Sequence, residues 1–439
     1  MVKARERLTL VEYGSPVDLS TKIIDVIGGS RTKADSLLLE AGRRVASSLK
    51  MDYNPISVEA RGVRAINFAG LIRLNPLLEL EVSPKFLRPE DDDNSWREDF
   101  FFLSTLSRHG HLLVSEHLSA SSGKPRDLVT LVARSLVGMY EGLKRRPLRG
   151  YRKTKETDFF IEGDPDPMDL VFPSPDGFEQ EVIRFDRRNQ WNSDIVAAAK
   201  ELLPDISNPL VMSSLLRMIE ELSPQNTPNG RRKPIPARHR GWIPLHELSV
   251  DVLAGFGLNY KKGQTHAPGY LVSTWQIWEN LLMVGIRLSF GRSAMLSQKG
   301  FVLGTKTKKN LEHKKENLWV FPDCVIKDDE ANLLMIIDAK YKGHVEKEQL
   351  RITEADIYEA LAFSRATGIN FVVLAYPAQP IINPPPVGTC TVFEKIDVDG
   401  VRLIGVQIES RLISKPRGLR DFSKNLEKEI RNLWSNPLD

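Results

Sequence analysis

The sequence is poor in cysteine, with only Cys324 and Cys390 among its 439 residues. Two thiols cannot build a disulfide scaffold or a zinc site of three or four cysteines, and so low a content is typical of a reducing cytoplasm. The sequence also lacks an apolar run long enough to cross a bilayer, and no signal-peptide core follows Met1. We therefore expect a cytoplasmic protein that does not enter a membrane.

A phosphate-binding loop for nucleotide hydrolysis is missing as well. The nearest match is Gly123-Lys124, which Pro125 follows and which no glycine precedes at the required position. In such loops the glycine-rich backbone surrounds the phosphates, and the lysine and a following Ser or Thr contact the phosphates and Mg²⁺. The sequence therefore predicts that this chain does not hydrolyse nucleotides by itself.

A large excess of charge of one sign is absent, because the net charge is only +4. The basic residues are nevertheless clustered, at positions 144–146, 149–155, 231–233, 238–240 and 306–315. Such clusters permit contact with a nucleic-acid backbone, although each one taken singly is better explained as a solvated loop. The charge distribution alone therefore does not identify a binding partner.

The length of the chain favours two or three domains. Short runs of alternating apolar and polar residues between positions 8 and 82 predict a small mixed or barrel-like β unit, and helical spacing follows up to position 143. The strongest turn chemistry lies in the Pro- and Asn-containing segment 223–236. We place a domain border there, between an α+β region, 1–235, and a second domain, 236–439.

Two apolar runs, 319–326 and 333–342, flank a polar turn and predict a β-hairpin. This apolar hairpin carries Asp323, Asp338 and Lys340. Because a strand alternates its faces, Asp338 and Lys340 should project from the same side. Uncompensated charge is costly in such surroundings, so the three residues predict either a salt-bridged hairpin or a functional site.

A divalent cation between the two carboxylates would lower that cost. Mg²⁺ prefers oxygen ligands and commonly takes one or two protein carboxylates, which leaves positions for phosphate and water. Lys340 would then lie beside the water that the metal activates. The hairpin therefore predicts Mg²⁺, for which Mn²⁺ can substitute, at Asp323 and Asp338.

Helical patterns flank the hairpin on both sides. Residues 270–290 are apolar almost all round, which predicts a buried helix, and the acid within it, Glu279, is by itself an ordinary solvent-facing residue. A capping box at 353–356 and a glycine at 368 bound a second helix. Residues 370–376 then predict a central strand. The order strand, strand, helix, strand predicts an α/β core.

Pro322-Asp323 followed by Asp338-Ala339-Lys340 resembles the PD-(D/E)xK nuclease motif. The continuation Tyr341-Lys342, then Asp356-Ile357-Tyr358 and Leu374-Ala375-Tyr376-Pro377, is similar to the McrC family. Members of that family are nuclease subunits of McrBC-type, modification-dependent restriction systems. The segment Leu78 to Lys85 resembles a pattern near the N-terminus of the family, so the resemblance extends beyond the predicted nuclease domain.

The resemblance implies an α/β, restriction-endonuclease-like nuclease domain within 236–439. Asp323 and Asp338 would ligate Mg²⁺ together with the backbone carbonyl of Ala339. Lys340 would lower the pKa of the attacking water or stabilise the negative charge that develops on the phosphate. The expected reaction is phosphodiester hydrolysis.

The resemblance also assigns residues around this centre. Nucleases of this type often carry an acid on the preceding helix, which makes Glu279 a candidate for a third catalytic acid. Tyr341, Asp356 and Glu359 would surround the site. The chain departs from the family at Glu359, where glutamine is usual, and at Phe363, where tyrosine is usual. These changes concern substrate orientation and not the metal centre.

Finally, the resemblance implies partners and a role in defence against phage DNA. The chain would cut double-stranded DNA. The resemblance also allows two nuclease domains to pair on the DNA. Region 1–235 would dock on a separate McrB-like AAA+ GTPase hexamer and stimulate it. Two alternatives stay open: a catalytically silent adaptor of such a motor, and a nuclease of a related defence system that recognises different DNA.

Overall fold

The computed structural model describes most of the chain, and its contacts divide it into two compact units. The described residues are 6–75, 77–87, 96–109, 128–172, 175–206, 208–222, 234–253, 270–307, 315–328, 330, 332–342, 344–346, 349–381 and 383–435. The first unit comprises residues 1–115 and 271–439, and the second comprises 116–270. The border predicted near 235 lies inside the second unit, and most of the loop-rich segment 223–236 lies outside the described residues.

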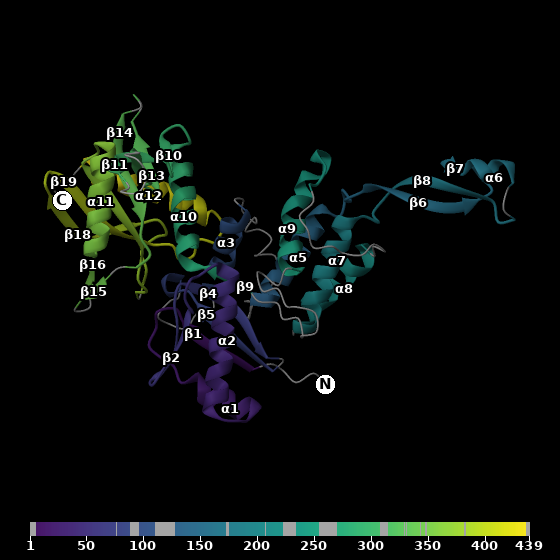
Figure 1. Ribbon diagram of the computed structural model, residues 1–439, viewed down its shortest axis with the longest axis horizontal. Helices are drawn as coiled ribbons and strands as arrows, with labels where there is room; N and C mark the ends of the chain where they lie inside the picture. Colours follow the sequence, from purple (N-terminus) through teal and green to yellow (C-terminus); the bar gives the residue numbers. More distant parts are fainter. Residues whose placement is uncertain are drawn as a thin grey trace. The chain divides into compact units, whose positions relative to one another are not determined.

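The first unit begins with a small β unit, as the alternating runs predict (Figure 1). Its elements are β1 (Glu6–Val11), α1 (Leu19–Ile27), α2 (Arg31–Leu49), β2 (Ile56–Glu59), β3 (Gly62–Ala65), β4 (Phe68–Asn75), β5 (Leu78–Ser83), η1 (Lys85–Leu87) and α3 (Trp96–His109). A four-stranded sheet has the order β1-β5-β4-β9, in which β9 is Tyr270–Ser273. Strand β1 runs parallel to β5, and β4 runs antiparallel to it. The chain therefore returns to this sheet just before the second part of the unit.

Strand β5 is buried on both faces, although its sequence alternates apolar and acidic residues. Its two acids are compensated by arginines. Glu81 accepts two bonds from Arg97, at 2.8 and 2.6 Å, and Glu79 accepts 2.8 and 2.5 Å bonds from Arg7. Charge-assisted pairs of this kind satisfy carboxylates that would otherwise be costly to bury.

The second part of the first unit is built on a six-stranded sheet of order β10-β13-β14-β17-β19-β18. Its elements are α10 (Thr274–Phe290), β10 (Met295–Ser297), β11 (Phe301–Thr307), β12 (Lys315–Val320), β13 (Cys324–Lys327), β14 (Leu333–Ala339), β15 (His344–Glu346), β16 (Gln349–Arg351), α11 (Glu354–Thr367), β17 (Phe371–Pro377), β18 (Cys390–Val398), β19 (Val401–Ile408) and α12 (Gly418–Ser435). Strands β14, β17 and β19 are parallel, and the other neighbours are antiparallel. The predicted order strand, strand, helix, strand is present as β13, β14, α11 and β17.

The predicted hairpin is present as β13 and β14, but its first apolar run is divided. Trp319 belongs to β12, which pairs with β11 in a separate two-stranded sheet. Pro322 has no N–H to donate to a ladder, and the chain leaves the strand before it reaches β13. Asp323 consequently lies just before β13, and Lys340 lies just after β14.

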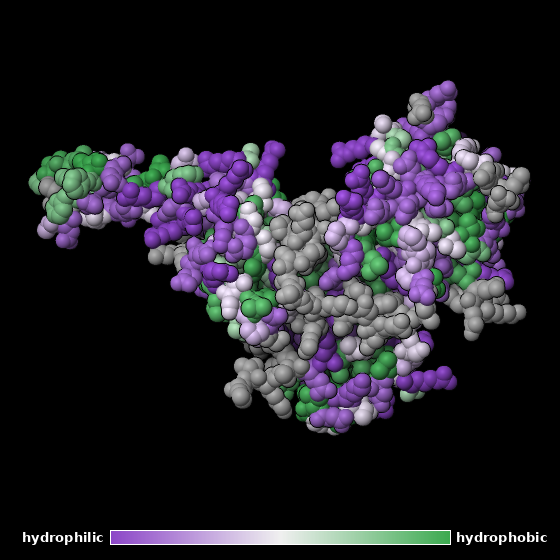
Figure 2. All heavy atoms as spheres, turned by 180° about the vertical axis from the view of Figure 1, so that it is seen from behind, coloured by the Kyte–Doolittle hydropathy of each residue, from purple (hydrophilic) through white to green (hydrophobic). Residues whose placement is uncertain are grey.

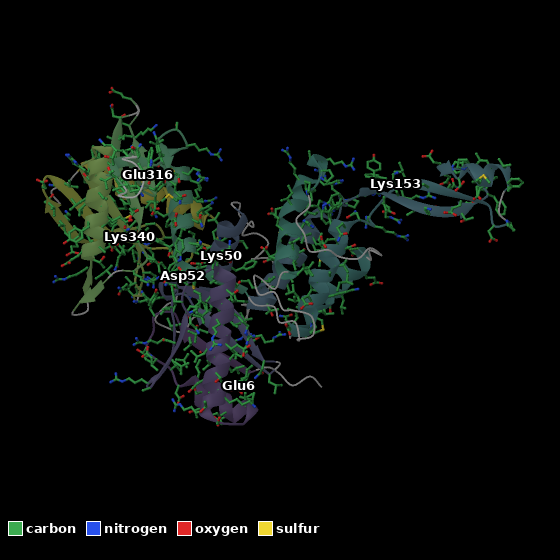
Figure 3. All side chains as sticks on the ribbon, in the orientation of Figure 1. Glu6, Lys50, Asp52, Lys153, Glu316 and Lys340 are labelled. Atoms are coloured by element: carbon green, nitrogen blue, oxygen red, sulfur yellow. The ribbon has the colours of Figure 1, made fainter. Side chains whose placement is uncertain are left out.

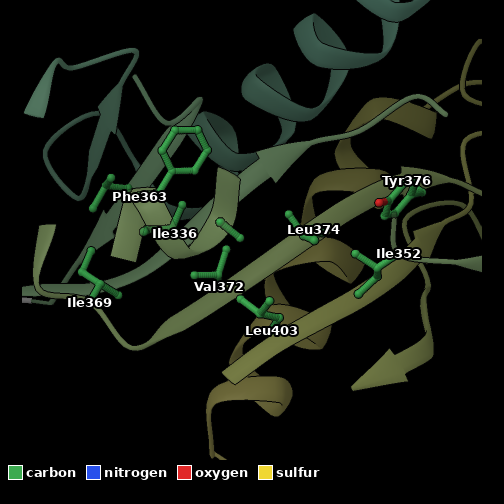
Figure 4. Packing of buried hydrophobic residues seen from close by; sticks show 10 residues of the cluster. Ile336, Ile352, Phe363, Ile369, Val372, Leu374, Tyr376 and Leu403 are labelled. Carbon is green, nitrogen blue, oxygen red and sulfur yellow. The ribbon is translucent and has the colours of Figure 1, made fainter. Parts of the chain in front are cut away.

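One apolar core lies between α11 and this sheet. Ile336, Val372, Leu374 and Leu403 from the strands pack together with Phe363 from α11 (Figure 4). Thr353 caps α11 by accepting the N–H of Asp356, and Gly368 ends it with a φ of 77°, both as predicted. The core fixes β14 and β17, the two strands that precede the candidate site.

Helices α10 and α12 pack closely at Gly285. A Cβ added there would lie 2.5 Å from Cε1 of Phe422, whose side chain is fully buried. We expect Gly285→Ala to lower the free energy of unfolding by about 1–3 kcal/mol, because the overpacking outweighs the better helix propensity of alanine. Denaturant unfolding checks this, with Gly304→Ala as control, since its Cβ would meet nothing within 4 Å. Equal losses in the two variants would contradict the packing argument.

The second unit joins a helical part to a long hairpin. Its elements are α5 (Leu128–Leu143), β6 (Gly150–Asp158), β7 (Asp164–Pro165), α6 (Pro167–Val171), β8 (Phe178–Asp186), α7 (Gln190–Leu202), η2 (Leu203–Asp205), α8 (Pro209–Leu222), η3 (Ala237–Trp242) and α9 (Ile243–Leu253). Helices α5 and α7 both contact α8 and α9. Asn189 caps α7, and Asn192 donates to the carbonyls of Leu148 and Arg187.

The far end of the hairpin exposes a hydrophobic patch, which we call the arm tip. It is visible as a group of apolar residues in Figure 2. Its members are Phe159, Phe160, Ile161, Met168, Leu170, Val171 and Phe172. A contiguous apolar patch of large side chains on the surface is typical of an interaction site.

Candidate active site

The candidate site forms where β14 ends beside β17 and where the chain enters β13. Asp338 pairs in register with Leu374, and Ala339 pairs with Ala375. The N–H of Ala339 donates to Oδ2 of Asp323 at 2.8 Å, which holds the Asp323 carboxylate at the end of β14. The negative charge of Asp323 also acts on Asp338, where it raises the pKa of the carboxyl. The two acids that the sequence singled out are therefore neighbours.

Lys340 lies next to these acids and is surrounded by carboxylates. Its Nζ is 2.7 Å from Oδ2 of Asp338, 2.5 Å from Oε2 of Glu359 and 3.6 Å from Oδ1 of Asp356. Figure 3 labels this lysine among the strands of the first unit. Burial acts to lower the pKa of Lys340, but the attraction of Asp338 and Glu359 outweighs it and raises the pKa. The lysine is therefore a fixed positive charge in this site.

The acid pair is short of positive charge. Burial raises the pKa of Asp338 to about 7, with Asp323 adding to the rise and Lys340 opposing it. Burial also raises the pKa of Asp323, and nearby Glu279 contributes in the same direction. A buried and a partly buried carboxyl therefore share the nearby Lys340 ammonium, which favours retention of a proton or binding of a cation.

Glu279 lies on α10 at the border of this cluster. Its pKa is raised, first by burial and then by the charge of Asp338, and Gln298 Nε2 donates to its Oε1 at 2.8 Å. The structure thus brings Glu279 within electrostatic reach of the pair. The side-chain hydrogen bond found for it, however, goes to Gln298 and not to either aspartate.

The donor set suits a hard divalent cation. Within the part of the chain that the structure describes, no three His, Cys, Asp or Glu side chains are grouped so that they could hold a metal ion. The carboxylates of Asp323 and Asp338 are oxygen donors, the kind that Mg²⁺ accepts while keeping several waters. The residues present therefore fit Mg²⁺, and they lack the thiolate and imidazole ligands typical of zinc.

Behind the site is a polar contact that sequence reasoning missed. Glu12, at the end of β1, is fully buried and accepts 2.5 Å bonds from the hydroxyls of Thr274 and Tyr341. Tyr341, which was expected to surround the site, thus links the segment after β14 to the N-terminal sheet. Trp278 of α10 also supports the segment, because its Nε1 donates to the carbonyl of Ala375 at 3.1 Å. No local signal marks these residues, since the partners are remote in sequence.

The buried Glu12 predicts a pH dependence of stability. Burial raises its pKa from 4.5 to about 7, so the folded chain keeps a proton that the unfolded chain releases above about pH 4.5. The free energy of unfolding should therefore fall, by up to about 3 kcal/mol from this group, as the pH rises from 4.5 to 7, and level off above. Denaturant unfolding of the wild type and Glu12→Gln at pH 5 and pH 8 measures this change in the free energy of unfolding. A variant whose pH dependence equals that of the wild type would contradict the assignment.

The fold and the site define a class: a mixed α/β protein in which the pattern Pro-Asp, Asp-x-Lys forms one acidic cluster beside a fixed ammonium. The family described as McrBC 5-methylcytosine restriction system component matches residues 63–377. This match covers more than half of the chain, and the chain belongs to that family. No curated protein matches the sequence.

One solved structure shares the fold. It is described as the refined half-complex from the tetradecameric assembly of Thermococcus gammatolerans McrB AAA+ hexamers with bound McrC. The similarity covers 96% of this chain and 100% of that chain, with a TM-score of 0.67 and 16% identity. A cryo-EM structure of the T. gammatolerans McrBC complex matches with a TM-score of 0.47 and 15% identity, over 64% of this chain and 88% of that chain. Among the described residues, no helix combines the length and apolar character needed to span a bilayer.

Proposed function

We propose that this chain is the McrC-type nuclease subunit of a McrBC-like restriction system, and that it hydrolyses phosphodiester bonds of double-stranded DNA with Mg²⁺. The observation that carries this proposal is the cluster of Asp323, Asp338 and Lys340 at the end of β14. Membership in the McrBC family supports it independently of the geometry.

Each residue of the cluster has a role in this proposal. Asp323, Asp338 and the carbonyl of Ala339 would hold Mg²⁺, or Mn²⁺ in its place. The ion supplies a polarised water and charge stabilisation at the phosphate when bound. Lys340 directs its ammonium toward the same space and stabilises negative charge there. Glu359 and Asp356 keep that ammonium in position through the 2.5 and 3.6 Å contacts.

Mg²⁺ withdrawal tests this function in the full complex. The chain is combined with a McrB-like AAA+ GTPase, GTP and plasmid DNA of defined methylation. We expect cleavage that EDTA stops and that excess Mg²⁺ or Mn²⁺ restores. Asp323→Ala should lose cleavage, whereas Asp421→Asn, an exposed acid on α12, should cut like the wild type. Full cleavage by Asp323→Ala would instead favour a catalytically silent adaptor accompanied by another nuclease.

The motor partner itself is also part of the proposal. The solved structure with the same fold carries McrC bound to McrB AAA+ hexamers. On this chain the arm tip presents large apolar side chains to solvent, and such a patch is suited to burial against a partner protein. We therefore assign the arm tip to docking on the motor.

A substitution at the arm tip is expected to weaken the complex. Phe160 is 77% exposed, so Phe160→Asp should leave the fold intact and lower affinity for the motor about tenfold or more, because a buried aromatic anchor is lost. Leu210→Asp on α8, where the side chain is 75% exposed, is the matched control. Calorimetry or light scattering with the purified motor measures the affinity. Equal affinities for both variants would remove the arm tip from the interface.

A further inference from the structure

A cavity of about 210 Å³ lies in the first unit beside the candidate active site. Its aromatic walls come from Tyr13, Phe86 and Tyr341, and Lys85 and Lys342 line it with positive charge. The rings are arranged edge to face or tilted: Phe86 and Tyr341 have centroids 5.9 Å apart at 88°, and Tyr13 and Tyr341 are 6.5 Å apart at 49°. Nζ of Lys342 lies 5.4 Å from the centroid of the Tyr13 ring. The cavity therefore combines aromatic side chains with two ammonium groups.

This cavity is connected to the acidic cluster through the backbone of both parallel strands. Tyr341 and Lys342 directly follow Lys340, and Tyr376 and Pro377, which also line the cavity, directly follow Ala375. The N–H of Lys340 donates to the carbonyl of Ala375 at 2.8 Å. The hydroxyl of Tyr376 donates to Asp356 at 3.0 Å, and Asp356 in turn contacts Lys340. The cavity and the acidic cluster are therefore built on consecutive residues of the same two segments, and Tyr376 and Asp356 link the cavity wall to Lys340.

We propose that the cavity binds one nucleotide of the DNA strand adjacent to the bond that is cut, with its base against the aromatic rings and its phosphate near Lys85 and Lys342. This inference rests on the proposed nuclease function and adds a subsite to it. Single-stranded nucleic acids are bound by this combination of aromatic faces for bases and cations for the backbone. The occupant is a base that has left the helical stack, as in enzymes that flip a nucleotide into a pocket.

Size and charge favour a single nucleotide over other occupants. The volume is several times that of one water, roughly 30 Å³, and below the 300–1,000 Å³ of sites for drug-sized ligands. It suits one planar ring system. The lining contains lysines and no acidic side chain, which favours an anionic ligand such as a nucleotide phosphate. The polar side chain of Gln379 is also present to contact a base edge.

Fluorescent DNA tests the subsite with the full chain and its motor partner. Duplexes carry 2-aminopurine at successive positions across the cleavage region, and EDTA prevents cutting during the measurement. We expect a change in 2-aminopurine emission at one position, because only one base enters the cavity. Ala378→Trp, which fills the cavity from its wall, should abolish that change. Lys342→Ala should reduce the affinity for the DNA about tenfold, because a cation assigned to the phosphate is lost.

Lys424→Ala is the matched control, because this lysine is exposed on α12, away from the cavity lining. It should keep both the emission change and the affinity. Emission that varies at no single position, or that Ala378→Trp leaves unchanged, overturns the subsite. If the wild-type complex nevertheless cuts DNA, such a result overturns the subsite but not the proposed nuclease function. Conversely, loss of the proposed nuclease function with the emission change intact would leave a nucleotide-binding cavity in a non-cutting subunit.

Discussion

Asp338→Asn is expected to reduce DNA cleavage by the reconstituted complex on the order of 10³-fold or more. Asp338 is buried, neighbours Asp323 and contacts Lys340 at 2.7 Å, so its carboxylate is shared between the proposed cation and the ammonium. An amide of the same shape keeps the packing but cannot supply negative charge to either of them. The initial rate of plasmid linearisation at saturating Mg²⁺ and GTP measures the loss.

Two accompanying measurements separate a lost site from a lost fold. The variant should unfold at a denaturant concentration close to that of the wild type at pH 8, because it removes a buried acid whose pKa is raised to about 7. Its binding of Mg²⁺, followed by calorimetry on the full chain, should weaken at least tenfold. Asp421→Asn should change neither quantity. An Asp338→Asn protein that still cuts at the wild-type rate would exclude the proposed site.

Local sequence patterns were sufficient to predict the core around the six-stranded sheet of the first unit. The hairpin of β13 and β14, the helix α11 between Thr353 and Gly368 and the strand β17 were all predicted, since each depends on neighbours a few residues apart. Alternation on a strand also predicted that Asp338 and Lys340 share one side, and their side chains meet. The division of the first apolar run at Pro322 was missed, because the pairing of β12 with β11 is not visible in either segment alone.

The contacts that cross the chain could not be predicted in the same way. Glu12 meets Thr274 and Tyr341 across 262 and 329 residues, and no periodicity indicates such a meeting. The discontinuous first unit likewise depends on contacts between segments that are remote in sequence. Turn-rich composition marked a border near 235, whereas contacts place 1–115 together with 271–439. Composition shows where a chain turns, and only packing decides which segments share a core. The cavity beside the site combines residues from both of these segments.

Lys340→Ala is expected to lower the rate of DNA cleavage on the order of 10²-fold or more, while leaving Mg²⁺ binding largely intact. The ammonium contacts Asp338, Glu359 and Asp356, so its removal eliminates the fixed positive charge near the phosphate but not the oxygen ligands. Single-turnover cleavage and calorimetric Mg²⁺ binding on the same preparation distinguish the two effects. Loss of cleavage in proportion to loss of metal binding would show that the lysine serves only to hold the acids.

Glu359→Gln provides the comparison that isolates the role of this ammonium. The change removes the 2.5 Å ion pair but keeps a hydrogen-bond acceptor at the same place, and it leaves Asp338 and Asp356 in contact with Lys340. Because Glu359 is half exposed in its side chain, the effect on stability should be small. We expect cleavage within about tenfold of the wild type, far above Lys340→Ala. Equal losses in the two variants would mean that the ion pair with Glu359, and not the ammonium facing Asp338, supports the reaction.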